Sequence, residues 1–323
     1  MNLIELLHEG HKRGASDLHY GTSSVPYLRI TGEMVALDGY GAIPPEIARE
    51  EIMSLCSLGL EQEVDGLIEH EGVRARYHIF RHTTGISAAF RIIPAEIPRL
   101  NSLGMPTSIS EAVEYTQGMV LVAGMTGAGK STTLASLVQE INSTRRAHIV
   151  TIEDPVEFAH PSFLSLVHQR EVGLQTKSFS QAVRAALRED PDVILIGELR
   201  DQETMELALS AAETGHLVLA SVHARSAVSA VERVINGVSP ECQSQARAMF
   251  AESLCLCLHQ ELIVGRGGRR VPLVESLVGT SAVRTLIRDG KTHQLTGIMQ
   301  ASRREGMQTA AMHREMLREQ QII

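Results

Sequence analysis

The spacing of hydrophobic and polar residues changes along the chain near residue 119. Before that point, short alternating segments mix with amphipathic stretches, a pattern typical of a small α+β unit over residues 1–95. The expected elements are two helices, over residues 2–9 and 47–58, and two pairs of strands, over residues 25–37 and 74–93. The pattern therefore predicts a first domain built from hairpins and helices.

A stretch rich in proline and glycine, residues 96–118, follows this first domain. Such residues interrupt regular structure, so we predict a linker here, with one short helix near residues 109–115. The linker leads into a region with a different hydrophobic pattern.

Short apolar runs alternate with amphipathic stretches over residues 119–280. The predicted strands are 119–123, 148–152, 193–196 and 217–222, and the predicted helices are 131–142, 180–189 and 201–213. Strands that alternate with helices predict a parallel sheet with crossover helices, which is an α/β fold. A hairpin is expected over residues 261–278, and residues 281–323 are predicted to form a charged helical tail.

Composition favours a globular protein of two ordinary domains, since 43% of the 323 residues are hydrophobic and 21% are charged. The net charge of −8 disfavours nucleic acid as the main partner, so no DNA binding is expected. The four cysteines form no C-x-x-C pair, which argues against a zinc ribbon and favours a reducing compartment. Because no apolar run approaches the ~18 residues of a membrane span, we expect a cytoplasmic protein without an integral membrane segment.

Residues 124–131, GMTGAGKS, match the phosphate-binding pattern G-x-x-x-x-G-K-[ST] between a predicted strand and a predicted helix. Glycines in such a loop let backbone N–H groups surround phosphate oxygens, and the helix N-terminus adds its dipole. Lys130 is expected to reach the β- and γ-phosphates of ATP, and the Ser131 hydroxyl to ligate Mg²⁺. The residues expected to bind nucleotide here are Gly124, Met125, Thr126, Gly127, Ala128, Gly129, Lys130, Ser131 and Thr132.

Acidic residues follow two of the other predicted strands, and a histidine follows a third. Ligands of a parallel sheet bind beyond the carboxyl ends of its strands, so these side chains are predicted to share one edge with the phosphate loop. Glu198 is the candidate for activating the attacking water. Glu153, Asp154 and Glu157 are candidates for contacts with metal-bound water or for a second activating group. A single acid in such a place is commonly a helix cap or a solvated side chain; four strand ends that converge favour catalysis.

Histidines and arginines give weaker signals. His223 follows the strand at 217–222 and is a candidate phosphate sensor, whereas His216 precedes that strand and is as readily a packing residue. Arg74, Arg76 and Arg91 suit either a solvated hairpin face or a charge clamp that reaches a nucleotide across a subunit boundary.

Longer motifs resemble those of the ATPases of type IV pili and type II secretion. TIEDPVEFAH at 151–160 is similar to their Asp box, and the segments at 178–201 and 211–224 are similar to their Walker B and His boxes. GASDLHY at 14–20 and the arginine pattern at 74–94 are similar to their N-terminal domain. The resemblance covers nearly the whole chain. It implies a RecA-like P-loop NTPase domain with a smaller PAS-like N-terminal α+β domain and a helical C-terminal tail.

Within this family, the chain looks most similar to the ATPases that retract pili. It is short, it lacks the tetracysteine motif of the assembly enzymes, and SAVRTLIRDGK at 281–291 resembles a motif of the retraction enzymes. The resemblance implies a homohexamer that hydrolyses ATP to retract type IV pili in twitching motility. It also implies a cytoplasmic location at the inner membrane, with a pilus platform protein as partner.

The same resemblance implies roles for individual residues. Lys130 and Ser131 would contact the phosphates and Mg²⁺, and Glu198 would be the catalytic glutamate. Glu157 would be a second essential acid, and His216 and His223 would act in catalysis or in coupling between domains. The arginines at 74, 76 and 91 would reach the nucleotide of a neighbouring subunit.

Two departures from the family motifs leave other functions open. The usual TLHT is SVHA at 221–224, which places Ala224 where a threonine is usual, and the retraction motif carries Thr285 and Asp289 in place of asparagine and glutamate. The alternatives are a pilus-assembly or type II secretion ATPase, and a regulatory paralogue that binds ATP but hydrolyses it weakly.

Overall fold

The computed structural model describes residues 2–30, 32–55, 63–93 and 96–323 of the chain. They belong to two compact units, Met1–Glu96 and Ile97–Ile323. Residues 56–58 of the second predicted helix, with Cys56 among them, and residues 94–95 at the predicted domain boundary lie outside the described residues.

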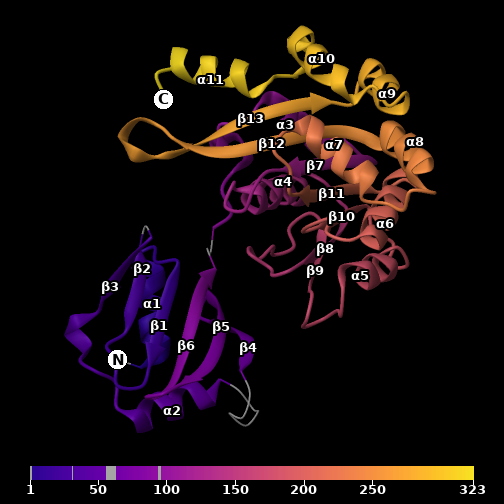
Figure 1. Ribbon diagram of the computed structural model, residues 1–323. Coiled ribbons are helices and arrows are strands. Elements are labelled where there is room, and N and C mark those ends of the chain that lie inside the picture. The colour runs from indigo at the N-terminus through magenta and orange to yellow at the C-terminus, as the bar shows by residue number, and fades with distance from the viewer. Residues whose placement is uncertain (1, 31, 56–62, 94–95) are drawn as a thin grey trace. The chain divides into compact units, whose positions relative to one another are not determined.

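The first unit is a six-stranded antiparallel sheet with two α-helices (Figure 1), in the strand order β3-β2-β1-β6-β5-β4. Its elements are α1 (Leu3–Lys12), β1 (Asp17–Gly21), β2 (Tyr27–Ile30), β3 (Glu33–Ala36), η1 (Asp38–Tyr40), α2 (Pro45–Ser54), β4 (Val64–His70), β5 (Val73–His82) and β6 (Gly85–Ile93). Helix α1 begins at a capping box formed by Asn2 and Glu5. The two predicted helices and both strand pairs are present, whereas β1 and β4 were not expected.

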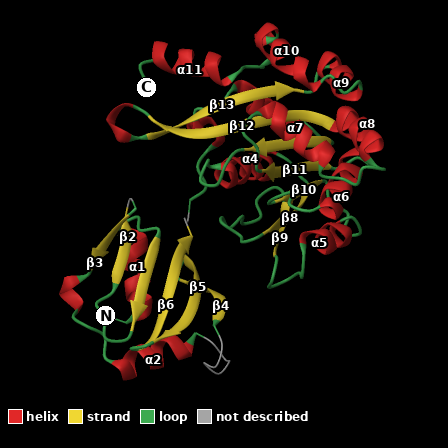
Figure 2. Cartoon of the chain, in the orientation of Figure 1, coloured by secondary structure: helices red, strands yellow, loops and turns green. Residues whose placement is uncertain are grey.

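The second unit is built around a seven-stranded sheet in the order β13-β12-β7-β11-β10-β8-β9 (Figure 2). All pairs are parallel except β12 with β13. The strands are β7 (Gly118–Ala123), β8 (His148–Glu153), β9 (Leu166–Glu171), β10 (Val193–Ile196), β11 (Leu217–Val222), β12 (Leu254–Val264) and β13 (Arg270–Val278). The four strands predicted from apolar runs are therefore confirmed, and the parallel α/β arrangement is confirmed with them.

Helices cover both faces of this sheet, since residues that alternate along β7 enter two separate cores. Met119 and Leu121 pack with α5 (Phe179–Ala186), α6 (Gln202–Glu213), α7 (Ala227–Asn236) and α8 (Gln243–Ser253). Val120 and Val122 pack with α4 (Lys130–Thr144) on the other face. Strands buried on both faces read as continuous apolar runs, which is why they could be recognised in the sequence.

The predicted linker and tail are folded parts of the second unit. Residues 97–117 carry η2 (Leu100–Leu103), α3 (Thr107–Glu111) and η3 (Ala112–Glu114), and Leu100, Ile109 and Val113 are buried in the core beneath α4. The last segment consists of η4 (Arg266–Gly268) in the hairpin turn, then α9 (Ser281–Arg288), η5 (Thr292–Gln294), α10 (Leu295–Ala301), η6 (Arg303–Glu305) and α11 (Ala310–Glu319). In the described part of the chain, no helix has the length and apolar character needed to cross a membrane.

Candidate functional site

The phosphate-loop sequence joins the carboxyl end of β7 to the N-terminus of α4. Gly127 and Gly129 have φ of 78° and 87°, left-handed values that favour glycine. At Gly124 the constraint is space, because a Cβ atom would lie 2.5 Å from the Gln260 carbonyl oxygen of β12. The glycines of the motif thus allow the loop to turn tightly against β12 and place the first turn of α4 at its end.

A buried polar network holds this loop from behind. Gln260 of β12 donates a hydrogen bond from Nε2 to the Ala128 carbonyl oxygen at 2.6 Å, and its Oε1 accepts one from the Thr133 hydroxyl at 2.9 Å. Both side chains are 1% exposed. No local sequence pattern predicts this contact, because it joins residues 127 positions apart.

Lys130 lies across the loop that precedes it. Its ammonium group donates to the Gly124 carbonyl oxygen at 2.9 Å and to the Met125 carbonyl oxygen at 3.2 Å. Burial lowers the pKa of Lys130, and the nearby negative charges of Glu198 and Glu157 partly oppose that shift. A cation is thus held beside the N-terminus of α4, where a phosphate anion is favoured.

Ser131 contacts an acid from the segment after β8. Its hydroxyl donates to Oε1 of Glu157 at 2.8 Å. The structure therefore brings together a hydroxyl and a carboxylate, both of which are oxygen ligands that Mg²⁺ accepts. This pair was predicted from strand ends and motif alone, without evidence that the two side chains would touch.

Glu198, the second residue after β10 ends at Ile196, lies between two basic side chains. Its Oε2 accepts a hydrogen bond from Nε of Arg200 at 2.9 Å, and its Oε1 lies 3.1 Å from Nε2 of His223. Arg200 also donates to Oδ2 of Asp154 at 2.9 Å, so one guanidinium joins the acids that follow β8 and β10. Arg200 had no role in the sequence prediction, although it stands two residues after Glu198.

Glu153 has a different environment from the other acids. Its Oε1 accepts hydrogen bonds from Thr151 at 2.6 Å and from Gln169 of β9 at 3.1 Å. Burial raises the pKa of Glu153, although these two hydrogen bonds oppose the shift. Two neutral side chains, those of Thr151 and Gln169, therefore hold the Glu153 carboxyl in place.

These side chains line one cavity of about 480 Å³ at the carboxyl edge of the sheet. Its predicted lining residues are Thr126, Gly127, Gly129, Lys130, Ser131, Thr132, Glu153, Asp154, Glu157, Glu198 and His223. Arg200 and Ser221 line it as well. Gly124, Met125 and Ala128 support the loop without lining the cavity, and the Met125 side chain is exposed. A single concave site therefore contains a phosphate loop, two basic side chains, four acids and an imidazole.

The structure does not bring His216 to this cavity. His216 stands at the amino end of β11, seven residues before His223, so about 20 Å of extended strand separates the two histidines. Its Nδ1 lies 3.0 Å from the Ala211 carbonyl oxygen, at the end of α6. Within the second unit, this contact agrees with the interpretation of His216 as a packing residue.

The three predicted arginines all lie on neighbouring strands of the first unit. Arg76 of β5 is paired in register with Arg91 of β6, and Arg74 lies opposite Ile93. Arg91 donates to Oδ1 of Asp17 at 3.2 Å and remains largely exposed.

Comparisons with known proteins agree with this fold and site. Residues 62–267 match the family described as Type II/IV secretion system protein. This match covers more than half of the chain, and the chain belongs to that family of P-loop proteins.

Two curated relatives match nearly from end to end. The chain is 43% identical to the uncharacterized protein YggR of Escherichia coli, over 96% of each protein. It is 41% identical to the type IV pilus retractation ATPase PilT of Pseudomonas aeruginosa, over 97% of this chain and 92% of that protein. A crystal structure of the pilus retraction motor PilT with bound ADP superposes with a TM-score of 0.92 at 39% identity, covering 100% of this chain and 94% of that one. The predicted resemblance and fold class are thereby confirmed, and the chain is an ATPase of this family.

Proposed function

We propose that this chain is a motor that hydrolyses ATP, with Mg²⁺, to retract type IV pili. The observation that carries the proposal is the cavity in which Lys130 and Ser131 of the phosphate loop face Glu198 and His223. The likeness to retraction enzymes over almost their full length supports the direction of force.

The phosphate loop accounts for nucleotide binding. Backbone N–H groups at the start of α4 point toward the cavity edge and favour an anion there. The Lys130 ammonium contributes a positive charge that can move from the Gly124 and Met125 carbonyl oxygens to the more negative phosphate oxygens. A hydroxyl and a carboxylate, on Ser131 and Glu157, suit a hard cation, and Mg²⁺ bound there would neutralise charge on the phosphates.

In this proposal, Glu198 orients and deprotonates the attacking water. Its carboxylate is only 14% exposed, and Arg200 and His223 each approach one of its two oxygens. These contacts fix the direction of the carboxylate, and the imidazole beside it offers a second group that can hold a proton. Asp154, which shares Arg200 with Glu198, holds the guanidinium from its other side.

We propose that the working form is a homohexamer at the cytoplasmic face of the inner membrane, docked on a pilus platform protein. Exposed apolar side chains support assembly: Phe163, Leu164 and Leu166 are 58%, 50% and 51% exposed at the start of the edge strand β9. Exposed apolar groups on an edge strand mark an interaction surface. In the assembly, Arg74, Arg76 and Arg91 would contact the nucleotide of a neighbouring subunit.

Hydrolysis tests the site directly. Glu198→Gln keeps the size of the side chain but removes its basicity, so turnover at saturating ATP should fall by about 100-fold or more while nucleotide binding is kept. Lys130→Ala should weaken binding and turnover together. Glu203→Gln is the matched control, because Glu203 is an exposed acid that pairs with Arg184 and lies outside the cavity. Normal turnover in Glu198→Gln would refute the assigned role.

Pilus counts in the host test the direction of force. Deletion should leave excess pili that do not retract, and a copy carrying Lys130→Ala should fail to restore retraction. Loss of pili or of secretion would instead indicate an assembly or secretion ATPase. Wild-type turnover close to that of Glu198→Gln would indicate a regulatory paralogue, the alternative suggested by Ala224 and Thr285.

A further inference from the structure

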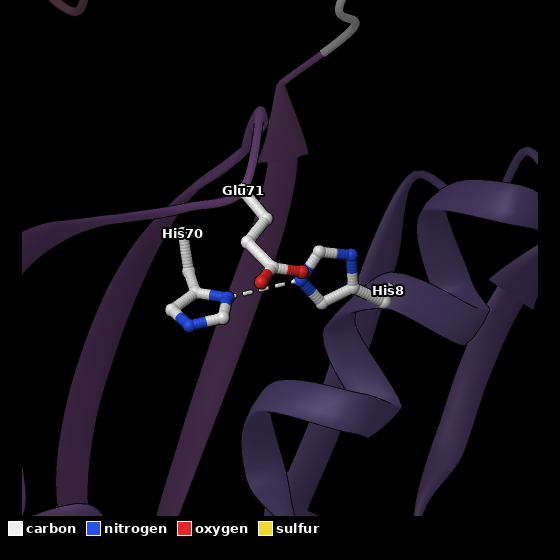
Figure 3. Close-up of side chains that lie close together, drawn as sticks. All are labelled: His8, His70 and Glu71. Carbon is white, nitrogen blue, oxygen red and sulfur yellow. Dashed lines mark hydrogen bonds between the residues drawn. The ribbon is translucent and has the colours of Figure 1, made fainter.

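Three side chains of the first unit that can ligate a metal ion come together, and none of them lines the nucleotide cavity. His8 belongs to α1, His70 ends β4, and Glu71 begins the turn between β4 and β5. One ligand atom from each lies within 4.8 Å of the other two (Figure 3). Among the described residues, no other set of three or more histidine, cysteine, aspartate or glutamate side chains meets this criterion.

The two imidazoles are already at the spacing of shared ligands. Nε2 of His8 lies 3.1 Å from Nδ1 of His70, with the rings at 82° to each other. Two nitrogens bound to one tetrahedral Zn²⁺ at 2.0–2.1 Å would be about 3.3 Å apart. The nitrogen–nitrogen distance therefore already matches that of two zinc ligands, and the hydrogen bond between the rings would give way to the two bonds to the ion.

The third ligand comes from an unfavourable backbone position. Glu71 and Gly72 form a two-residue turn in which both φ angles are positive, 45° and 81°. Asparagine or glycine is favoured at the first position of such a turn, because a longer L-residue is strained there. Glu71 nevertheless occupies it, and Figure 3 shows its carboxylate directed toward the two rings. A local backbone cost combined with a convergent side chain points to a use for that carboxylate.

We propose that His8, His70 and Glu71 bind a divalent transition-metal ion of the zinc class. Two imidazole nitrogens and one carboxylate oxygen form a set that suits Zn²⁺, with a fourth position left for water. Mg²⁺ and Ca²⁺ prefer ligand sets made of oxygen alone, so the magnesium of ATP hydrolysis does not compete here.

A metal ion at this position would join two distant parts of the first unit. His8 and His70 are 62 residues apart, on a helix and on a hairpin. An ion that binds the folded chain and not the unfolded one stabilises the folded form by mass action. Neither histidine lines the nucleotide cavity, so the site and its test are independent of ATP hydrolysis.

Calorimetric titration of the full-length chain with ZnCl₂ tests the proposal. The titration uses protein without a polyhistidine tag and without bound nucleotide, in excess Mg²⁺, which occupies sites made of oxygen ligands alone. We expect saturable binding of one ion per chain and a rise in the unfolding temperature of the zinc-loaded protein. His8→Gln and His70→Gln should each weaken binding by more than about 100-fold, since loss of even an outer-shell partner costs 10- to 100-fold.

A second histidine pair provides a matched control. His148 and His168 lie 3.0 Å apart between Nε2 and Nδ1, with their rings at 87°, but no third ligand residue joins them among the described residues. His168→Gln should therefore leave zinc affinity unchanged. Undiminished one-to-one binding in both His8→Gln and His70→Gln, or no binding by the wild-type chain at millimolar zinc, would overturn the proposal.

Glu71→Asn tests whether the carboxylate is a ligand, and it does so with a substitution that should favour the turn. Asparagine suits the turn, so the metal-free variant should be as stable as the wild type or more stable. Its zinc affinity should fall at least about tenfold, because the shorter amide is neutral and a poorer ligand. Unchanged affinity would remove Glu71 from the site and contradict the three-ligand proposal.

Discussion

The buried contact between Gln260 and Thr133 yields a quantitative prediction about how the phosphate loop is supported. Gln260→Met keeps an unbranched side chain of similar length but removes both hydrogen bonds of the amide. The Ala128 carbonyl loses its 2.6 Å donor, and the Thr133 hydroxyl loses its 2.9 Å acceptor. Each orphaned buried group costs about 1–3 kcal/mol, so the free energy of unfolding should fall by about 2–6 kcal/mol.

A double-mutant cycle separates the network from general disturbance of the core. Thr133→Val removes the hydroxyl and leaves only the amide oxygen of Gln260 without its donor, at a cost of about 1–3 kcal/mol. The double variant lacks both the Gln260 amide and the Thr133 hydroxyl, so only the Ala128 carbonyl is left without a partner. The double variant should therefore be more stable than the sum of the single effects predicts, by the cost of two orphaned groups, about 2 kcal/mol or more.

Urea unfolding followed by far-UV circular dichroism measures these differences, and nucleotide titration provides a second readout. Because Gln260 holds the loop carbonyl at Ala128, Gln260→Met should also weaken nucleotide binding, whereas an effect on the core alone would leave it unchanged. The reasoning is refuted if Gln260→Met unfolds within about 0.5 kcal/mol of the wild type, or if the two substitutions are additive.

Two further predictions concern pH and the orientation of Glu198, the proposed catalytic glutamate. Burial lowers the pKa of His160 to about 4 from the usual 6.5, so the unfolded chain binds more protons between these values and stability is lost as the pH falls through this range. The free energy of unfolding should drop by about 2 kcal/mol between pH 7 and pH 5 from this group alone, and urea unfolding of His160→Gln should lack that part of the drop. Arg200→Gln should change the free energy of unfolding by less than about 1 kcal/mol, because the guanidinium is half-exposed. Steady-state assays should nevertheless show a lower kcat, since Glu198 loses a fixed partner. An unchanged kcat would show that Arg200 does not position Glu198.

The parts of the fold that could be predicted are the buried strands, whose residues form unbroken apolar runs in the sequence. Strands such as VILI at 193–196 are apolar on both faces, and glycines mark the phosphate loop. Strand β9 was missed because its segment LVHQRE mixes apolar and polar residues, as suits an edge strand. The start of β12 was predicted seven residues too late, because α8 ends at Ser253 and the strand begins at Leu254 without a glycine or proline between them.

The site was predictable as a set of residues but not as a set of contacts. Strand ends placed Glu157 and Glu198 at one edge, since parallel strands share a direction. The contacts of Ser131 with Glu157, and of Arg200 with both Asp154 and Glu198, depend on side-chain directions that periodicity does not encode. His8 and His70 meet only because an antiparallel sheet brings α1 to a turn 62 residues away.

The Lys130 ammonium and the Ser131 hydroxyl already have protein partners, and this limits where binding energy can come from. Lys130 donates to two loop carbonyls, and Ser131 donates to Glu157. A phosphate that takes over the Lys130 donors exchanges one hydrogen bond for another, so the number of bonds changes little. The gain comes from charge, because phosphate oxygens accept more strongly than carbonyl oxygens and lie at the N-terminus of α4. Within the proposed function, Mg²⁺ would replace the hydrogen bond between Ser131 and Glu157, so these two oxygens would serve as ligands only once the nucleotide has brought the ion.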